Sequence, residues 1–109
     1  RYCTQQTHDR MIAYTSQVPH VLACAYVMSP RCAEHNGFSA GSYRDVSRVA
    51  RINAALWADL FLSNRAELSD ELVELIRNIE SIREAVDCGD REKIVALLSA
   101  AREKKEKFG

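Results

Sequence analysis

Three arginines recur at helical spacing in the stretch GSYRDVSRVARI, residues 41–52. Arg48 lies four residues after Arg44 and three before Arg51, so a helix places all three on one face. A guanidinium is a planar fork of donors that matches a carboxylate through two parallel hydrogen bonds. The spacing therefore indicates a site for an organic anion. The alternative is a solvated basic face that pairs locally with Asp45 or a neighbouring glutamate.

His20 is a second candidate, because it directly follows Pro19 inside an apolar helical stretch. Proline lacks a backbone donor, so it frees a carbonyl and opens space that a polar side chain can use. His20 can therefore reach a cleft, or it can be a core histidine bonded to a carbonyl, and the sequence leaves both open. Cys24 lies one turn after His20, but no further ligands accompany this pair, so we predict no metal site.

Trp57 lies in the apolar stretch ALWADLF, where a lone tryptophan indicates core packing more than ligand contact. The chain contains no GxGxxG, P-loop, GxSxG or HExxH motif. We therefore expect no catalytic residue and no bound cofactor in this chain. If it works in an enzyme, the bond-making chemistry takes place on another domain.

Composition limits the class of protein. The chain has 109 residues, 47% of them hydrophobic and 28% charged, which suits one small domain with a core. Its 15 basic and 15 acidic residues balance, whereas nucleic-acid-binding proteins usually carry a basic excess. No apolar run has the length of a membrane span, and the first residues lack the pattern of a signal peptide. Because the chain starts at an arginine, we interpret it as a fragment.

The four cysteines match no CxxC pattern; they are Cys3, Cys24, Cys32 and Cys88. We interpret them as free thiols of a protein in the reducing cytoplasm, with a disulfide pair as the alternative.

The elements that position these side chains are expected to be helices, because helical spacing dominates and alternation is nearly absent. The first helix is predicted to begin at Thr7 or Asp9, to kink at Pro19 and to stop near Pro30. Every residue from position 21 to position 28 is apolar, which predicts a helix buried on all sides. A loop with Gly37 and Gly41 is expected to follow.

Capping residues mark the predicted helix boundaries in the rest of the chain. Ser42 followed by Asp45 is typical of a capping box for the arginine-bearing helix, and Asn53 can cap the next helix. A long helix over residues 65–88 is expected to end at Gly89. Asp90 then caps a last helix, whose charged end REKKEKFG we expect to be solvated and frayed.

The long helix carries a heptad seam of apolar residues with steps of four and three: Leu68, Leu72, Leu75, Ile79, Ile82 and Val86. A chain this short does not easily cover both this seam and an all-round apolar helix. We therefore predict packing between subunits, with a homodimer as the simplest closed form. The alternative is that the two features pack on each other within one chain.

Three ordered stretches resemble the C-terminal region of prephenate dehydrogenases: HDR…IAYTSQVPHVLA, GSYRDVSRVA and LWADLFLSNR. The family pattern is HD, then S-H-x-P-H, a glycine loop, F-R-D-x-T-R-x-A and W-x-D-I-F-x-S-N. The resemblance extends from about Thr7 to the end of the sequence and includes the helices after Asn64.

This resemblance implies an NAD(P)-dependent enzyme of tyrosine biosynthesis that oxidises and decarboxylates prephenate to 4-hydroxyphenylpyruvate. It implies a Rossmann domain that binds the cofactor and carries the catalytic histidine, followed by an all-helical domain that dimerises. Residues 1–109 resemble only the helical part. We therefore expect one all-helical domain, in an intertwined homodimer, that is inactive alone.

The resemblance also assigns pocket roles. His20 matches the last histidine of S-H-x-P-H, and Arg48 matches the second arginine of F-R-D-x-T-R, which holds a substrate carboxylate in a partly dry cleft. Four further positions match the first arginine of that motif, two pocket or interface positions beside it, and an aromatic residue near the pocket mouth; they are Arg44, Asp45, Gly41 and Trp57.

Gln17 departs from the family pattern, since it stands where the first histidine of S-H-x-P-H is usual. Ser47 replaces a threonine and Tyr43 replaces a phenylalanine. The histidine's role is not extended to Gln17, which can alter the polarity of the pocket or the choice of substrate. Arogenate, with an amine where prephenate has a keto group, is therefore an alternative. A non-enzymatic helical interaction domain is the rival class; it explains the seam but neither the Pro19–His20 pair nor the arginine helix.

Overall fold

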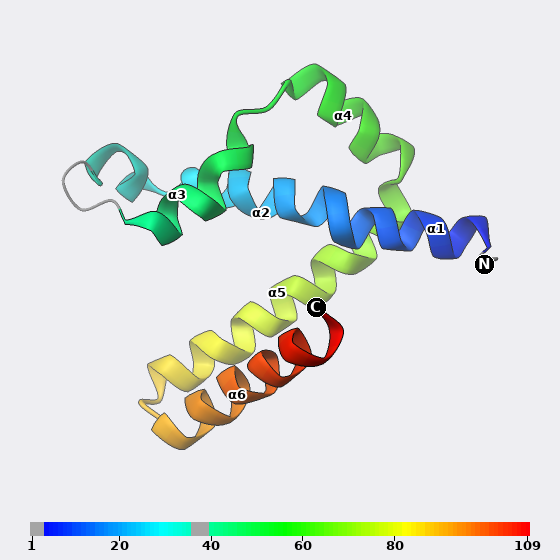
Figure 1. Ribbon diagram of the computed structural model, residues 1–109. Coiled ribbons are helices and arrows are strands. Elements are labelled where there is room, and N and C mark those ends of the chain that lie inside the picture. Colours follow the sequence, from blue (N-terminus) through cyan, green and yellow to red (C-terminus); the bar gives the residue numbers. More distant parts are fainter. Residues whose placement is uncertain (1–3, 36–39) are drawn as a thin grey trace. The chain divides into compact units, whose positions relative to one another are not determined.

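The computed structural model describes residues 4–35 and 40–109, and within these ranges it contains helices, turns and no strand (Figure 1). The all-α prediction is therefore confirmed. Cys3 and Gly37, which the sequence analysis named, lie outside the described residues. The chain divides into two compact units, residues 1–72 and residues 73–109.

The first unit begins with three helical segments in direct succession: α1 (Gln5–Ile12), the π-helix η1 (Ala13–Gln17) and α2 (Val18–Val27). Thr4 is the N-cap, because its side-chain oxygen accepts the N–H of Thr7 at 3.0 Å. The helix thus begins before Thr7 and Asp9, the two alternative caps predicted from the sequence. Thr4 takes that place because its backbone is extended, as a cap requires.

Pro19 lies in the first turn of α2, where a missing N–H costs least. The expected irregularity takes the form of the π-helical turn before it, in which the N–H of Val18 reaches back five residues to the carbonyl of Ala13. This wider turn rotates the faces of α1 and α2 relative to each other and leaves Gln17 at the buried side.

The segment after α2 contains the 3-10 helix η2 (Pro30–Glu34), α3 (Gly41–Ser47), the 3-10 helix η3 (Arg48–Ala50) and α4 (Ala54–Ser63). Asn53 caps α4 as predicted, since its side-chain oxygen accepts the N–H of Leu56 at 3.0 Å. The predicted capping box of Ser42 and Asp45 is wrong. The N-cap of α3 is Ala40, so both residues already lie within the helix.

Burial in the first unit is limited to small or medium residues: Ala13, Gln17, Val18, Ala23 and Leu68. The sequence predicts that the helix over residues 21–28 is buried on all sides, and this prediction is wrong. Leu22, Tyr26 and Met28 are 39%, 47% and 80% exposed, because α3 and η3 pack against α2 without surrounding it.

The second unit is a helical hairpin made of α5 (Arg65–Asp87), whose first residues belong to the first unit, and α6 (Arg91–Phe108). Gly89 ends α5 with a φ of 63°, a conformation that glycine adopts without strain. Asp90 caps α6 by accepting the N–H of Lys93 at 3.0 Å. Both ends follow the sequence prediction. The prediction of a frayed tail is wrong, because α6 stays helical to Phe108 and an Arg102–Glu106 ion pair spans its last turns.

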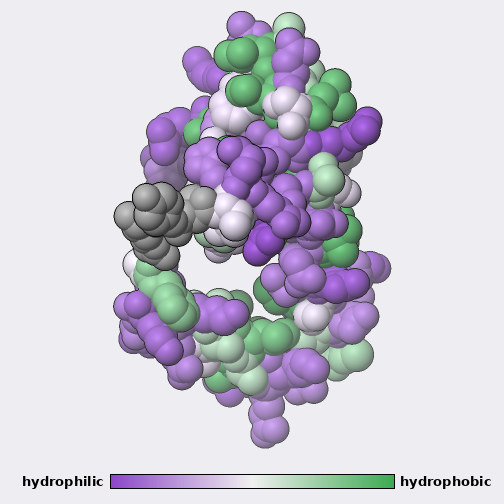
Figure 2. Space-filling view, turned by 90° about the vertical axis from the view of Figure 1, so that its right-hand side faces the viewer, coloured by the Kyte–Doolittle hydropathy of each residue, from purple (hydrophilic) through white to green (hydrophobic). Residues whose placement is uncertain are grey.

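Many apolar side chains reach the surface of the single chain (Figure 2). The heptad seam is an example: Leu68 is 5% exposed, whereas Ile79 and Val86 are 49% and 57% exposed. Among residues 73–109, Ala85 is the one buried hydrophobic residue, with 4% of its surface exposed. None of the helices in the described ranges is both long enough and apolar enough to cross a membrane.

Candidate functional site

Arg44, Arg48 and Arg51 line one cavity of about 530 Å³. The helix changes from α to 3-10 geometry after Ser47, yet the three side chains still border the same space. The other lining residues come from α2, from the residue after η2 and from the same helical segment; they are Val27, His35, Tyr43, Ser47 and Ala50. Sequence spacing therefore located the cationic side of a real cavity.

No carboxylate pairs with these guanidiniums among residues 4–35 and 40–109, Asp45 included. The alternative of local pairing is thus not realised. Five arginines elsewhere do pair with a carboxylate: Arg10, Arg31, Arg77, Arg83 and Arg102. Uncompensated charge of one sign in a concave site attracts an oppositely charged ligand.

All three guanidinium-bearing residues are exposed in the single chain. The partly dry cleft expected around Arg48 is therefore not formed by this polypeptide alone. The reason is geometric, since α2, α3 and η3 supply one wall and the cavity is open to solvent on another side.

Tyr43 forms part of the same wall. Its phenol oxygen lies 3.5 Å from the thiol of Cys32, and its ring lies 4.4 Å from the ring of His35 and 5.7 Å from that of Tyr26. The hydrogen bond with Cys32 raises the pKa of the Tyr43 phenol above its ordinary value, so the phenol is neutral at physiological pH.

Behind Tyr43 lies a second cavity of about 310 Å³, lined by Tyr26, Ser29, Arg31, Cys32, His35 and Tyr43. Neither Tyr43 nor His35 is predicted from the sequence as a site residue. Tyr43 is noted only as a replacement for phenylalanine, and His35 lies outside the arginine-bearing helix. Only the packing of η2 beside α3 brings them together.

His20 and Trp57 form a separate cluster. Their rings are stacked, with centroids 3.8 Å apart and planes 22° from parallel, and Phe61 meets Trp57 edge-on. The Nδ1 atom of His20 lies 2.7 Å from the carbonyl oxygen of Ser16. Because a carbonyl can only accept, Nδ1 carries the hydrogen, and the neutral ring keeps Nε2 as an acceptor.

The two open interpretations of His20 are therefore compatible. It is a half-buried histidine bonded to a carbonyl, and its second nitrogen has no hydrogen-bond partner in the described part of the chain. Neither His20 nor Trp57 lines the arginine cavity. The structure thus places Arg44 and Arg48 beside Arg51 in a guanidinium cluster, and His20 and Trp57 in a separate imidazole–indole stack.

Asp45 and Gly41 lie on α3, are exposed and do not line the cavity. A Cβ atom added at Gly41 would meet no atom within 4 Å. Nothing within the described part of this chain therefore requires glycine at that position.

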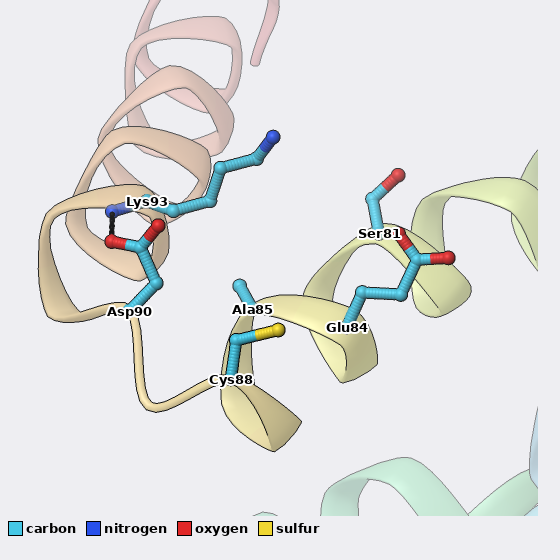
Figure 3. A pocket seen from close by; sticks show the side chains of 6 residues that line it. All are labelled: Ser81, Glu84, Ala85, Cys88, Asp90 and Lys93. Carbon is cyan, nitrogen blue, oxygen red and sulfur yellow. Dashed lines mark hydrogen bonds between the residues drawn. The ribbon is translucent and has the colours of Figure 1, made fainter.

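A smaller cavity of about 190 Å³ lies at the turn of the hairpin (Figure 3). Its lining residues are Ser81, Glu84, Ala85, Cys88, Asp90 and Lys93. The first turn of α6 borders this cavity, and the Asp90 carboxylate accepts the N–H of Lys93 there, so a negative charge already occupies this helix start. Cys88 is a free thiol, as are Cys24 and Cys32, and no cluster of three metal-ligating residues occurs within the described ranges.

The described residues thus form an all-α fold with a cationic cavity and many exposed apolar side chains. The chain belongs to the family described as "Prephenate dehydrogenase, dimerization domain", which matches residues 4–100. The resemblance seen in the three sequence stretches is therefore confirmed.

Relatives and a solved structure agree with this family. The chain is 30% identical over 103 residues to a prephenate dehydrogenase of Bacillus subtilis, a match that covers 90% of this chain and 28% of the relative. It is 34% identical over 89 residues to a cyclohexadienyl dehydrogenase of Zymomonas mobilis, covering 76% of this chain and 30% of the relative. It thus spans less than a third of either length.

The fold is shared with the crystal structure of Synechocystis arogenate dehydrogenase, with a TM-score of 0.87 and 18% sequence identity. That match covers 98% of this chain and 41% of the other. The helical arrangement is therefore that of a known domain.

Proposed function

We propose that this chain is the substrate-binding and dimerisation domain of an NAD(P)-dependent prephenate dehydrogenase. The full enzyme would oxidise and decarboxylate prephenate to 4-hydroxyphenylpyruvate. The family of the chain supports this assignment, as do relatives named as prephenate and cyclohexadienyl dehydrogenases.

The observation that carries the proposal is the cavity lined by three arginines that have no carboxylate partner in the described part of the chain. Prephenate is a dianion with two carboxylates, and guanidiniums bind carboxylates through paired, charge-assisted hydrogen bonds. In this proposal Arg48 binds one substrate carboxylate, and Arg44 and Arg51 add positive potential. We also assign His20 to the substrate pocket, Trp57 to the neighbourhood of the pocket mouth, and Asp45 and Gly41 to pocket or interface positions.

The division of labour follows from the chemistry. The ring of prephenate gives a hydride to the nicotinamide and loses carbon dioxide, which leaves an aromatic ring. We assign cofactor binding and the catalytic histidine to a Rossmann domain on the N-terminal side of this sequence. The residues of this chain hold and orient the dianion, which lowers the entropic part of the barrier.

A second copy of the chain is the proposed partner, in a homodimer. The exposed apolar residues of α2 and α5 would be buried by it. A covering subunit or nucleotide domain would also exclude water from the arginine cavity, and a carboxylate–guanidinium bond gains strength when water is excluded.

Steady-state kinetics of Arg48→Ala in the full-length enzyme test this proposal. Losing one partner of a buried charged pair costs roughly 2–5 kcal/mol, so kcat/KM for prephenate should fall by about 30-fold or more. The KM for the nicotinamide cofactor should hardly change. The matched control is Arg77→Ala, because Arg77 is an exposed arginine on α5 that pairs with Glu74.

An unchanged kcat/KM for prephenate in Arg48→Ala removes Arg48 from the pocket. The same assay with arogenate decides the substrate, because its amine takes the place of the keto group. A full-length protein that turns over neither compound would favour the helical interaction domain instead.

A further inference from the structure

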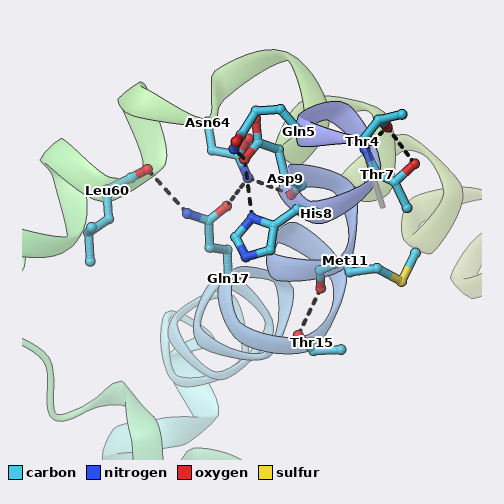
Figure 4. A network of polar contacts seen from close by, with 10 residues as sticks. All are labelled: Thr4, Gln5, Thr7, His8, Asp9, Met11, Thr15, Gln17, Leu60 and Asn64. Carbon is cyan, nitrogen blue, oxygen red and sulfur yellow. Dashed lines mark hydrogen bonds and ion pairs between the residues drawn. The ribbon is translucent and has the colours of Figure 1, made fainter. Parts of the chain in front are cut away.

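Gln17 is the one polar residue that is buried in the described part of the chain, with 5% of its surface exposed. Its side-chain amide has partners for both of its ends (Figure 4). The Nε2 group donates to the carbonyl of Leu60 at 3.2 Å, and the Oε1 atom accepts from the amide of Asn64 at 2.9 Å. Asn64 also donates to the carbonyl of Asp9 at 2.9 Å, so the network joins α1, η1 and the end of α4.

The position of this network explains why a polar group is buried there. Leu60 lies in the last turn of α4, where backbone carbonyls lack a backbone N–H partner, and its carbonyl accepts the hydroxyl of Ser63 at 2.9 Å. Gln17 supplies a donor to one of them from outside. A buried amide without partners is costly, so the position of Gln17 between η1 and α4 depends on the bonds with Leu60 and Asn64.

The contact with Leu60 is in register with the stack of His20 on Trp57. His20 follows Gln17 by three residues, and Trp57 precedes Leu60 by three residues. Both distances are close to one helical turn. The two contacts are therefore consecutive links between antiparallel segments, and a displacement at the first is transmitted to the second.

We propose that Gln17 is a positioning residue that fixes α4 on η1 and thereby sets the His20–Trp57 stack. A role of this stack in substrate binding rests on the proposed function, whereas the geometry of the stack is observed independently of it. An amide provides both donors and acceptors at every pH. A histidine, which is usual at this position in the resembling family, provides that combination only while neutral. The hydrogen bonds of Gln17 with Leu60 and Asn64 are therefore insensitive to pH.

The first test is the fluorescence of Trp57 in Gln17→Leu, a variant of similar size without the hydrogen bonds. The same spectrum recorded in a Trp57→Phe background is subtracted, which isolates the signal of this one indole. We expect a shift of its emission to longer wavelength and a loss of its near-ultraviolet dichroism. Gln6→Leu is the matched control, because Gln6 is an exposed glutamine on α1.

His20→Ala removes the stack directly and should give a shift of the same sign. In the double variant, Gln17→Leu should add little to it. If Gln17→Leu lowers the denaturation midpoint but leaves the Trp57 signal of the folded protein unchanged, Gln17 is merely structural and the proposal is overturned.

Gln17→His supplies a test in which folding is not in question, since one protein is compared with itself at two pH values. The neutral imidazole that this variant introduces can both donate and accept, but the protonated imidazole cannot accept from Asn64. The Trp57 signal should match the wild type well above about pH 6.5 and shift reversibly below it.

The wild type over the same pH range controls for the other titratable and charged groups near the network, namely His8, Asp9, His20, Arg10 and Glu67. Identical pH profiles of the wild type and Gln17→His would contradict the proposal.

In the full-length enzyme, Gln17→Leu should raise KM for the substrate by roughly 10- to 100-fold, because a displacement of about 1 Å can cost that much. The kcat should fall less. This readout depends on the proposed function, whereas the fluorescence does not. A fluorescence shift without a change in KM would confirm the positioning role and count against the substrate role of the stack.

Discussion

Arg44, Arg48 and Arg51 differ from the paired arginines of the described residues in what surrounds them. Arg31, Arg77 and Arg83 pair with glutamates one turn away on exposed surfaces, an arrangement that contributes little to stability. The three arginines of the cavity have no such pairs within the described ranges. Their charge is thus available to a ligand, which is the physical basis of the proposed carboxylate site.

Tyr43 gives a prediction that depends on pH. Its pKa is raised in the folded protein by the bond with Cys32, so the folded state holds this proton more tightly than the unfolded state. The corresponding stability is complete below about pH 10 and is lost as the pH rises through the folded pKa. Denaturant titrations should show a steeper loss of stability above about pH 10 in the wild type than in Tyr43→Phe. Tyr14→Phe, at a 61% exposed tyrosine, should behave as the wild type does. Equal slopes for the wild type and Tyr43→Phe would contradict the assigned cause.

At the level of residues, the sequence could predict what depends on local spacing. Arg44, Arg48 and Arg51 fall on one face because their separations match a helical turn. Tyr43 and His35 could not be found in this way, because their meeting depends on how η2 and α3 pack. The same holds for Gln17, whose partners are more than forty positions away along the chain.

At the level of the elements, the sequence correctly predicts some helix ends and not others. Asn53 and Asp90 cap α4 and α6 as predicted, because each precedes a helix that starts directly after it. Ser42 has a suitable side chain but lies one residue inside α3. The π-helix of residues 13–17 could not be predicted, because a wider turn leaves no periodic pattern of its own.

Two substitutions compare the contributions of Asn53 and Ser42 to the stability of α4 and α3. Asn53→Ala removes the cap of the helix that carries Trp57 and should lower the free energy of unfolding by about 1 kcal/mol. Ser42→Ala should leave it nearly unchanged or raise it slightly, because alanine favours helix interiors. Chemical denaturation measures both. A loss in Ser42→Ala as large as in Asn53→Ala would mean that the sequence-predicted capping box forms after all.

Over the molecule as described, many large apolar side chains are exposed. The side chains of Leu22, Tyr26, Ile79, Ile82 and Val86 are all more than a third exposed. Their heptad and helical spacing is the feature that predicted association from the sequence. What the sequence could not predict is which of these side chains the chain covers by itself, since that depends on the packing of each unit.

Self-association should therefore depend on the outer face of α5. Ile79→Glu introduces a charge at a position that is 49% exposed in the single chain, so its effect on folding should be small. We expect it to convert a dimer into a monomer in sedimentation at micromolar concentration, because a buried unpaired charge is costly. Asn78→Glu is the matched control on the same helix. A dimer that persists in Ile79→Glu would place the subunit contact elsewhere.

The central claim is that the Arg48 guanidinium binds a substrate carboxylate, and equilibrium binding of prephenate to the full-length protein tests it most directly. Arg48→Lys keeps the positive charge but loses the planar pair of donors. The account predicts that Kd rises by about tenfold or more in Arg48→Lys, rises further in Arg48→Ala, and stays unchanged in Arg77→Ala. A Kd that is the same in the wild type and all of these variants would contradict it.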